Sequence, residues 1–226
     1  MSRTSGVARA ASAVKRRLRL PDPKMDRRPD DRKSWDVLRT IEGIEARLGR
    51  DDPVLDVGSY ASAILPALGR LGYTNLSGID LDPRVAEMSA EVSAELVVGD
   101  LTETRWPAEH FAAITAISVI EHGVPEAGLF GEVSRLLRPG GLFLFSTDYW
   151  PEKIDTSDTR LFGLPWTIFS AAEIEGFVER AAGYGLRPMF DPVQALRDVE
   201  SRPINFAGRD YTFLHGVLAK TGGATS

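Results

Sequence analysis

Residues 54–59 read Val-Leu-Asp-Val-Gly-Ser, and this stretch decides the fold. Apolar, mostly branched residues around one aspartate predict a short buried strand, and the glycine that follows predicts a tight turn. Amphipathic helices are predicted on both sides of it, at residues 34–48 and 60–69, where apolar residues recur every three to four positions. A strand enclosed by helices is the repeating unit of an α/β sheet.

The same alternation continues along the chain. Further strands are predicted at residues 76–80, 95–99, 111–119, 142–146, 186–190 and 211–220. Further helices are predicted from Pro83 onward and at residues 125–138 and 170–183. These elements predict one Rossmann-like α/β domain. Its sheet is doubly wound and seven-stranded, with helices on both faces and an antiparallel last strand pair.

The composition is that of a globular protein, with 43% hydrophobic and 26% charged residues among 226. No apolar run approaches the roughly 18 residues of a membrane span, so we expect a cytoplasmic protein without a membrane segment. The chain has no cysteine, which excludes disulfides and thiolate metal sites. Asp148, Asp155 and Asp158 could hold a divalent ion, but their spacing matches no metal-binding loop, and we predict no metal.

Charge divides the chain near residue 33. Residues 1–33 hold 11 Lys or Arg and 4 Asp, a net charge of +7, whereas residues 34–226 carry −12. Because the first segment lacks an apolar period, we predict a flexible basic arm, with a lid over the active site or an organelle address as alternatives. The acidic body disfavours nucleic acid as a partner, since phosphates require clustered positive charge.

Acidic and small residues follow four of the predicted strands. Ligands of such sheets bind beyond the carboxyl ends of the strands, so these residues form the candidate site. In chain order they are Asp56, Gly58 and Ser59; Asp80 and Leu81; Asp100 and Leu101; and Ile117, Ser118, Glu121 and His122. A local turn role is the alternative for each aspartate, since Asp commonly accepts hydrogen bonds from nearby backbone amides.

This ordered set, with the Leu-Arg-Pro-Gly-Gly turn at residues 137–141, resembles the class I S-adenosylmethionine-dependent methyltransferases over residues 52–148. The resemblance implies that residues 34–226 form a methyltransferase domain that binds S-adenosylmethionine and releases S-adenosylhomocysteine. It implies that Asp56, Gly58 and Ser59 face the amino-acid end of this cofactor.

The resemblance also assigns the other strand ends. Asp80, with Leu81 beside it, accepts hydrogen bonds from both ribose hydroxyls. Asp100 accepts from the adenine amino group, while the backbone amide of Leu101 meets a ring nitrogen. The site beneath the cofactor is lined by Ile117 and Ser118.

One turn departs from the family pattern. The usual Gly-x-Gly-x-Gly is here Gly-Ser-Tyr-Ala-Ser at residues 58–62, which keeps only the first glycine. A cofactor-binding protein without catalytic activity therefore stays an alternative. A dinucleotide dehydrogenase is disfavoured, because its Gly-x-Gly-x-x-Gly turn needs glycine where Tyr60 and Ala63 stand.

The expected reaction requires a base when the acceptor is a hydroxyl. His122 follows the central strand, beside the expected position of the methyl group, and is the candidate base, with Glu121 as a second candidate. Packing or helix capping is the alternative role for both residues.

Residues 148–169 form an unusually long connection rich in aromatic side chains, which suit sugars and planar acceptors. The candidate acceptor-binding residues are Tyr149, Trp150, Trp166 and His215, for which core packing is the alternative. We therefore expect a methyltransferase acting on oxygen or nitrogen of a small molecule, such as a sugar or secondary metabolite. A protein or nucleic-acid methyltransferase is the alternative.

Overall fold

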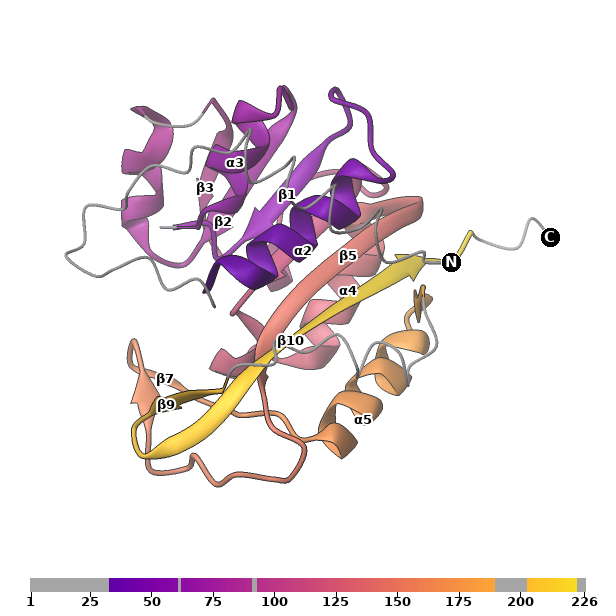
Figure 1. The fold of residues 1–226 in the computed structure, drawn as a ribbon. Coiled ribbons are helices and arrows are strands. Elements are labelled where there is room, and N and C mark those ends of the chain that lie inside the picture. Colours follow the sequence, from indigo (N-terminus) through magenta and orange to yellow (C-terminus); the bar gives the residue numbers. More distant parts are fainter. Residues whose placement is uncertain (1–32, 61, 91–92, 190–202, 223–226) are drawn as a thin grey trace, which may run out of the picture.

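The computed structural model describes residues 33–60, 62–90, 93–189 and 203–222. The predicted basic arm lies outside these residues, apart from Lys33. Within the described part, an eight-stranded sheet forms the centre of the molecule (Figure 1). Its strands are β1 (Val54–Val57), β2 (Leu76–Asp80), β3 (Glu95–Val98), β4 (Phe111–Ile117), β5 (Leu137–Tyr149), β8 (Leu186–Pro188), β9 (Ile204–Phe206) and β10 (Arg209–Lys220).

Seven of these strands follow the order β3-β2-β1-β4-β5-β10-β8. Neighbours from β3 to β5 pair in parallel, and β10 is antiparallel to both β5 and β8. The predicted doubly wound sheet with an antiparallel last pair is thus confirmed. Strand order reverses between β1 and β4, and in this class of sheet a ligand binds beyond the strand ends at that position.

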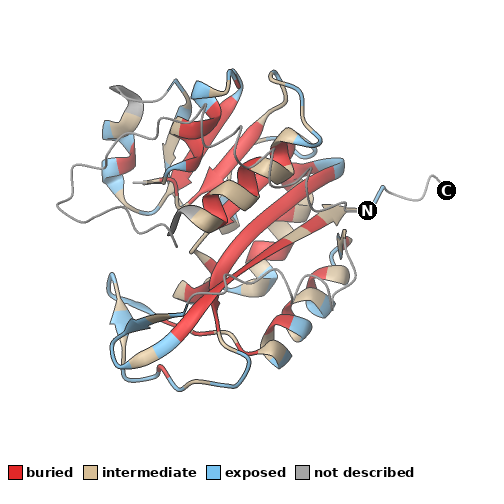
Figure 2. Ribbon diagram, viewed as in Figure 1, coloured by how far each residue is buried: buried red, intermediate tan, exposed pale blue. Residues whose placement is uncertain are grey.

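Helices cover both faces of the sheet, as predicted. The helices are α2 (Lys33–Glu45), α3 (Ile64–Arg70), α4 (Glu126–Leu136) and α5 (Ala171–Ala182), with short 3₁₀ helices η1 (Pro83–Ala90), η2 (Leu101–Glu103) and η3 (Ile120–His122). One hydrophobic cluster joins α2 and α3 to Val54 and Leu144, and the other joins α4 and α5 to Leu55 and Phe145. Because neighbouring strand residues face opposite sides, both faces of the sheet are buried (Figure 2).

The fifth strand is longer than the pattern of apolar residues predicts. It extends from Leu137 to Tyr149 instead of residues 142–146, because Leu137 pairs with Phe111 of β4 and Tyr149 pairs with Thr212 of β10. Asp148 and Tyr149 therefore belong to the sheet and not to the loop after it. Hydrogen bonds to segments distant in sequence thus extend the strand beyond the apolar run that predicted it.

Other boundaries also differ from the predictions. The helix expected at residues 60–69 begins at Ile64, the segment from Pro83 is a 3₁₀ helix, and β4 ends at Ile117. Strand β9, which pairs with β10, and the small hairpin of β6 (Arg160–Leu161) and β7 (Leu164–Pro165) have no counterpart in the predictions. These strands are only two or three residues long, which is too short for a periodic pattern to reveal.

Candidate active site

The turn after β1 requires glycine at its first position. Gly58 has φ +69°, in the left-handed region, and a Cβ atom there would lie 2.7 Å from Cγ2 of Val119. The amides of Gly58 and Ser59 both donate to the carbonyl of Ile79 at the end of β2. Gly58 therefore brings the ends of β1, β2 and β4 together at the point where strand order reverses.

Asp80 connects the turns that follow β1 and β2. Its Oδ1 accepts a hydrogen bond from the Asp82 amide at 2.8 Å, and its Oδ2 accepts one from the Tyr60 amide at 2.9 Å. The local turn role considered for this aspartate is thus present. An ionised carboxylate has about four acceptor positions, so two amide bonds leave capacity for two hydroxyl donors.

Asp56 is fully buried in β1. The hydroxyl of Thr115 donates to its Oδ1 at 2.5 Å, and the Ser62 side chain also hydrogen-bonds to this carboxylate, but burial dominates and raises the pKa of Asp56 to about 7. No described residue donates a hydrogen bond to Asp56 Oδ2, and the same holds for the buried Oγ of Ser59. Unsatisfied buried polar atoms are rare in native proteins. This pair fits a ligand that brings hydrogen-bond donors, such as an amino-acid ammonium group.

The residues after β3 and β2 form a more exposed rim. Oδ1 of Asp100 caps η2 by accepting from the amide and the hydroxyl of Thr102, both at 2.8 Å. Asp100 is exposed, Leu81 is 63% exposed and Leu101 is buried. Asp100 thus has a structural role as a cap, and its predicted adenine contact remains a prediction.

Ser118 follows the fourth strand directly and has a strained conformation. Its φ is +54°, in the left-handed region that disfavours residues other than glycine. The Ser118 amide donates to both the carbonyl and the hydroxyl of Ser146 on β5, each at 3.2 Å. Ser118 and the preceding Ile117 are half-buried.

Glu121 and His122 lie in η3, directly after this strand end. Glu121 is 1% exposed, and its Oε2 accepts a hydrogen bond from the Thr147 hydroxyl at 3.4 Å. His122 is half-buried, and its ring meets the edge of the Phe162 ring at a centroid distance of 5.7 Å. Of the two candidate bases, His122 therefore has the more accessible side chain.

Three of the four predicted acceptor-binding residues belong to one neighbourhood. Trp150 and Trp166 share a hydrophobic cluster with Trp35 of α2, and Trp35 meets the His215 ring at 6.5 Å. The indole nitrogen of Trp166 donates to Oδ2 of Asp148 at 2.7 Å. Tyr149 instead packs in the core beneath α4 and α5. The geometry therefore favours the core alternative for Tyr149, and also for Trp166 and His215, which are only 2% and 5% exposed.

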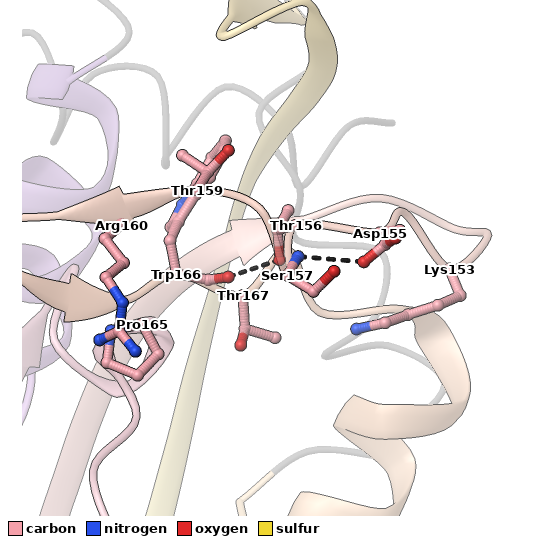
Figure 3. Close-up of a pocket in the computed structure, with 9 residues that line it drawn as sticks. All are labelled: Lys153, Asp155, Thr156, Ser157, Thr159, Arg160, Pro165, Trp166 and Thr167. Carbon is pink, nitrogen blue, oxygen red and sulfur yellow. Dashed lines mark hydrogen bonds between the residues drawn. The ribbon is translucent and has the colours of Figure 1, made fainter.

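Residues 153–167 enclose a pocket of about 290 Å³ within the long connection after β5. Figure 3 shows Lys153 and Arg160 at opposite sides of it, with hydroxyl side chains between them. This segment is fixed against the strand end, because the Thr167 amide donates to the Glu121 carbonyl at 2.9 Å. The pocket therefore lies in the part of the chain expected to select the acceptor.

Several buried polar residues near the site were not predicted from the sequence. Asp36 and Thr40 of α2, and Thr115 and Ser146 of the sheet, are at most 2% exposed. Each one interrupts an otherwise apolar face or strand, and this interruption is the signal that could have identified them. In the described residues, no group of three or more His, Asp or Glu side chains is placed to hold a metal ion. No helix within them is long and apolar enough to cross a membrane.

Comparison with known proteins agrees with this geometry. Residues 55–145 match the sequence model of the methyltransferase domain family. The ubiquinone biosynthesis O-methyltransferase of Colwellia psychrerythraea is 30% identical over 122 residues, or 50% of this chain and 49% of that protein. The ribosomal protein L11 methyltransferase of Geobacillus kaustophilus is 25% identical over 165 residues, or 67% of this chain and 48% of that protein. The chain spans about half the length of these curated relatives.

A solved structure shares the fold across nearly the whole chain. The 1,6-didemethyltoxoflavin-N1-methyltransferase of Burkholderia thailandensis, solved with bound 1,6-didemethyltoxoflavin and S-adenosylhomocysteine, has a TM-score of 0.56 and 19% identity. The alignment covers 98% of this chain and 92% of that one. Residues 55–145 therefore carry a methyltransferase domain, and the chain has the fold of the class I S-adenosylmethionine-dependent methyltransferases.

Proposed function

We propose that this chain is an S-adenosylmethionine-dependent methyltransferase that modifies oxygen or nitrogen of a small molecule. The observation that carries the cofactor assignment is the arrangement of carboxylates at the ends of β1 and β2. Asp56 and Asp80 lie near enough for the charge of Asp80 to raise the pKa of Asp56. A cationic cofactor fits this acidic site, because a positive charge stabilises both ionised carboxylates.

The cofactor-binding roles follow the strand ends. Asp56 Oδ2 and Ser59 Oγ, both buried without a hydrogen-bond partner among the described residues, fit the polar amino-acid end. Asp80 retains acceptor capacity for two ribose hydroxyls beyond its bonds to Tyr60 and Asp82. Asp100, which is exposed, would receive the adenine amino group.

The methyl group would pass from the sulfonium of the bound cofactor to the acceptor oxygen or nitrogen, leaving S-adenosylhomocysteine. For this transfer, the protein must hold the acceptor atom in line with the sulfur–methyl bond and remove the proton of the acceptor. We assign proton removal to His122, which is half-buried and lies in η3, just after β4. Glu121 is assigned a supporting role, because its side chain is buried against Thr147.

The acceptor is proposed to bind between η3 and the hairpin of β6 and β7. His122 and Phe162 face each other across this boundary, and Pro165 lies close to Gly123. Phe162 is 90% exposed although it is aromatic, which suits contact with the planar or apolar part of an acceptor. The polar pocket behind the hairpin would take the hydroxyl-bearing part.

A macromolecular acceptor is the second candidate, and the likeness to the ribosomal protein L11 methyltransferase favours it. One experiment separates the two acceptor classes. The purified chain is incubated with isotopically labelled S-adenosylmethionine in two separate reactions. One reaction contains a metabolite extract, and the other contains the protein fraction of a lysate. We expect mass spectrometry to find the label in metabolites that gain one methyl group. Label in proteins only would overturn the small-molecule assignment.

Binding of S-adenosylhomocysteine is the prior test. Isothermal titration calorimetry with this product should give saturable binding at one site. Absence of binding would overturn the whole proposal. Binding without any methyl transfer would instead support a non-catalytic cofactor-binding protein.

A further inference from the structure

The sheet-facing side of α2 carries two polar residues one helical turn apart. Asp36 and Thr40 are 2% and 0% exposed, whereas the residues beside them on this face, such as Val37 and Ile41, are apolar. Figure 1 shows α2 packed beside β5, and the helix also contacts β10. The two polar residues are therefore buried where α2 packs on these strands.

Two polar residues of the sheet meet them. Ser146 of β5 and His215 of β10 stand directly opposite each other in the antiparallel pair. The Ser146 hydroxyl donates to Oδ2 of Asp36 at 2.9 Å, and Thr40 Oγ1 lies 3.1 Å from Nε2 of His215. We call these four residues the α2 polar quartet. Two residues one turn apart on the helix thus contact two residues that pair across neighbouring strands of the sheet.

One half of the quartet reaches the candidate cofactor site. The Ser146 hydroxyl also accepts a hydrogen bond from the Ser118 amide at 3.2 Å. Ser118 is the residue with φ +54° at the end of β4. A continuous path thus runs from the Ser118 amide through the Ser146 hydroxyl to the Asp36 carboxylate. The contact between Thr40 and His215 joins α2 to β10 instead and is comparably buried, which makes this pair a natural control.

Stability alone does not account for this path. Apolar side chains of similar size often replace buried polar groups without loss of stability, and a left-handed serine adds strain. Strain of this kind persists only where the surroundings enforce it. The hydrogen bonds from Ser118 to Ser146 supply that enforcement at a position predicted to line the cofactor.

We propose that Asp36 is a positioning residue that, through Ser146, holds Ser118 in its left-handed conformation and thereby sets the floor of the cofactor site. This inference rests on the proposed function, because Ser118 is assigned to the cofactor there. It gives helix α2 a role in cofactor binding that residues 54–122 alone do not reveal.

A double-mutant cycle tests the proposal by calorimetry with S-adenosylhomocysteine. Ser146→Ala should weaken binding by about threefold to tenfold, the usual effect of one lost hydrogen bond. Glycine adopts a positive φ without strain, so in the Ser118→Gly background the same change should have almost no effect. Asp36→Ala alone should weaken binding to a similar extent, and Asp36→Ala combined with Ser146→Ala should bind no more weakly than Ser146→Ala alone.

Controls separate the possible failures. Thr40→Val removes the neighbouring pair and should lower the melting temperature while leaving the dissociation constant within about twofold. An equal loss of affinity from Ser146→Ala in both backgrounds would show a general packing effect and overturn the positioning role. Lack of binding by the unaltered protein would instead reject the proposed function itself. The two failures are therefore distinguishable.

Discussion

The backbone amide of Tyr60 donates a hydrogen bond of 2.9 Å to Oδ2 of Asp80. Tyr60 stands where the family pattern has its second glycine, so a residue of the altered turn is tied directly to the predicted ribose-binding carboxylate. The amide can make this bond with any side chain attached, since only the backbone is used. The missing glycine therefore does not separate the first turn from the second strand end.

Asp80 should be essential for cofactor affinity. Asp80→Ala removes the proposed ribose acceptor and also releases the amides of Tyr60 and Asp82. We expect S-adenosylhomocysteine to bind at least about tenfold more weakly, because bonds to a charged acceptor contribute roughly 1.5–3 kcal/mol. Asp51→Ala, an exposed carboxylate before the amino end of β1, is the matched control and should bind normally. Unchanged affinity in Asp80→Ala would remove this assignment.

Asp56 should make the stability of the protein depend on pH. Burial raises its pKa from the ordinary 3.8 to about 7, so the folded state holds this proton more tightly than the unfolded state. The associated stability is fully present below pH 3.8 and is lost as pH rises through 7. Asparagine does not titrate, so Asp56→Asn should be more stable than the parent at pH 8 by a wider margin than at pH 5.

Thermal unfolding at both pH values measures this difference, and calorimetry provides the functional readout. Asp56→Asn should gain stability yet lose affinity for S-adenosylmethionine, because the carboxylate is proposed to meet a cationic ligand. Asp51→Asn, on the exposed surface, should change neither quantity. Parallel melting profiles of the parent and Asp56→Asn would contradict the elevated pKa.

His122 should affect catalysis and not cofactor binding. Its ring lies beside the exposed Phe162, at the boundary proposed for the acceptor. With an acceptor found by the metabolite screen, His122→Ala is expected to lower kcat by roughly 10²–10⁴ while the affinity for S-adenosylhomocysteine is kept. A kcat within about threefold of the parent would exclude His122 as the base.

Phe162 should contribute to acceptor binding at a cost in stability. It occupies a left-handed turn position with φ +56°, which asparagine tolerates better than phenylalanine. Phe162→Asn should therefore raise the melting temperature slightly but increase the KM for the acceptor several-fold. Ala207→Asn makes the same backbone change at φ +50° in the hairpin of β9 and β10. Ala207→Asn should raise the melting temperature without changing the KM for the acceptor. Equal KM values for Phe162→Asn and Ala207→Asn would contradict the role of Phe162 in acceptor binding.

Local sequence signals were sufficient to predict the succession of strands and helices along the chain and the polar residues near the ends of β1 to β4. The strands that contain or precede Asp56, Asp80 and Ser118 are each predicted from a local run of apolar residues, and glycine marks the turn at Gly58. Each predicted cofactor residue accordingly lies at or just beyond a strand end, or in the turn after it. The acceptor side was harder to predict, because residues 148–169 lack any period and their packing depends on distant partners.

The sequence by itself thus determined the class of fold and the acidic strand ends, because both depend on patterns within one strand and its turn. Only the tertiary structure decided that Tyr149 lies in the core, that Phe162 faces His122, and that Asp36 meets Ser146. The last two residues are 110 positions apart, and Thr40 and His215 are 175 apart. Such pairs form only when α2 packs on the completed sheet, and no local pattern encodes the register of that packing.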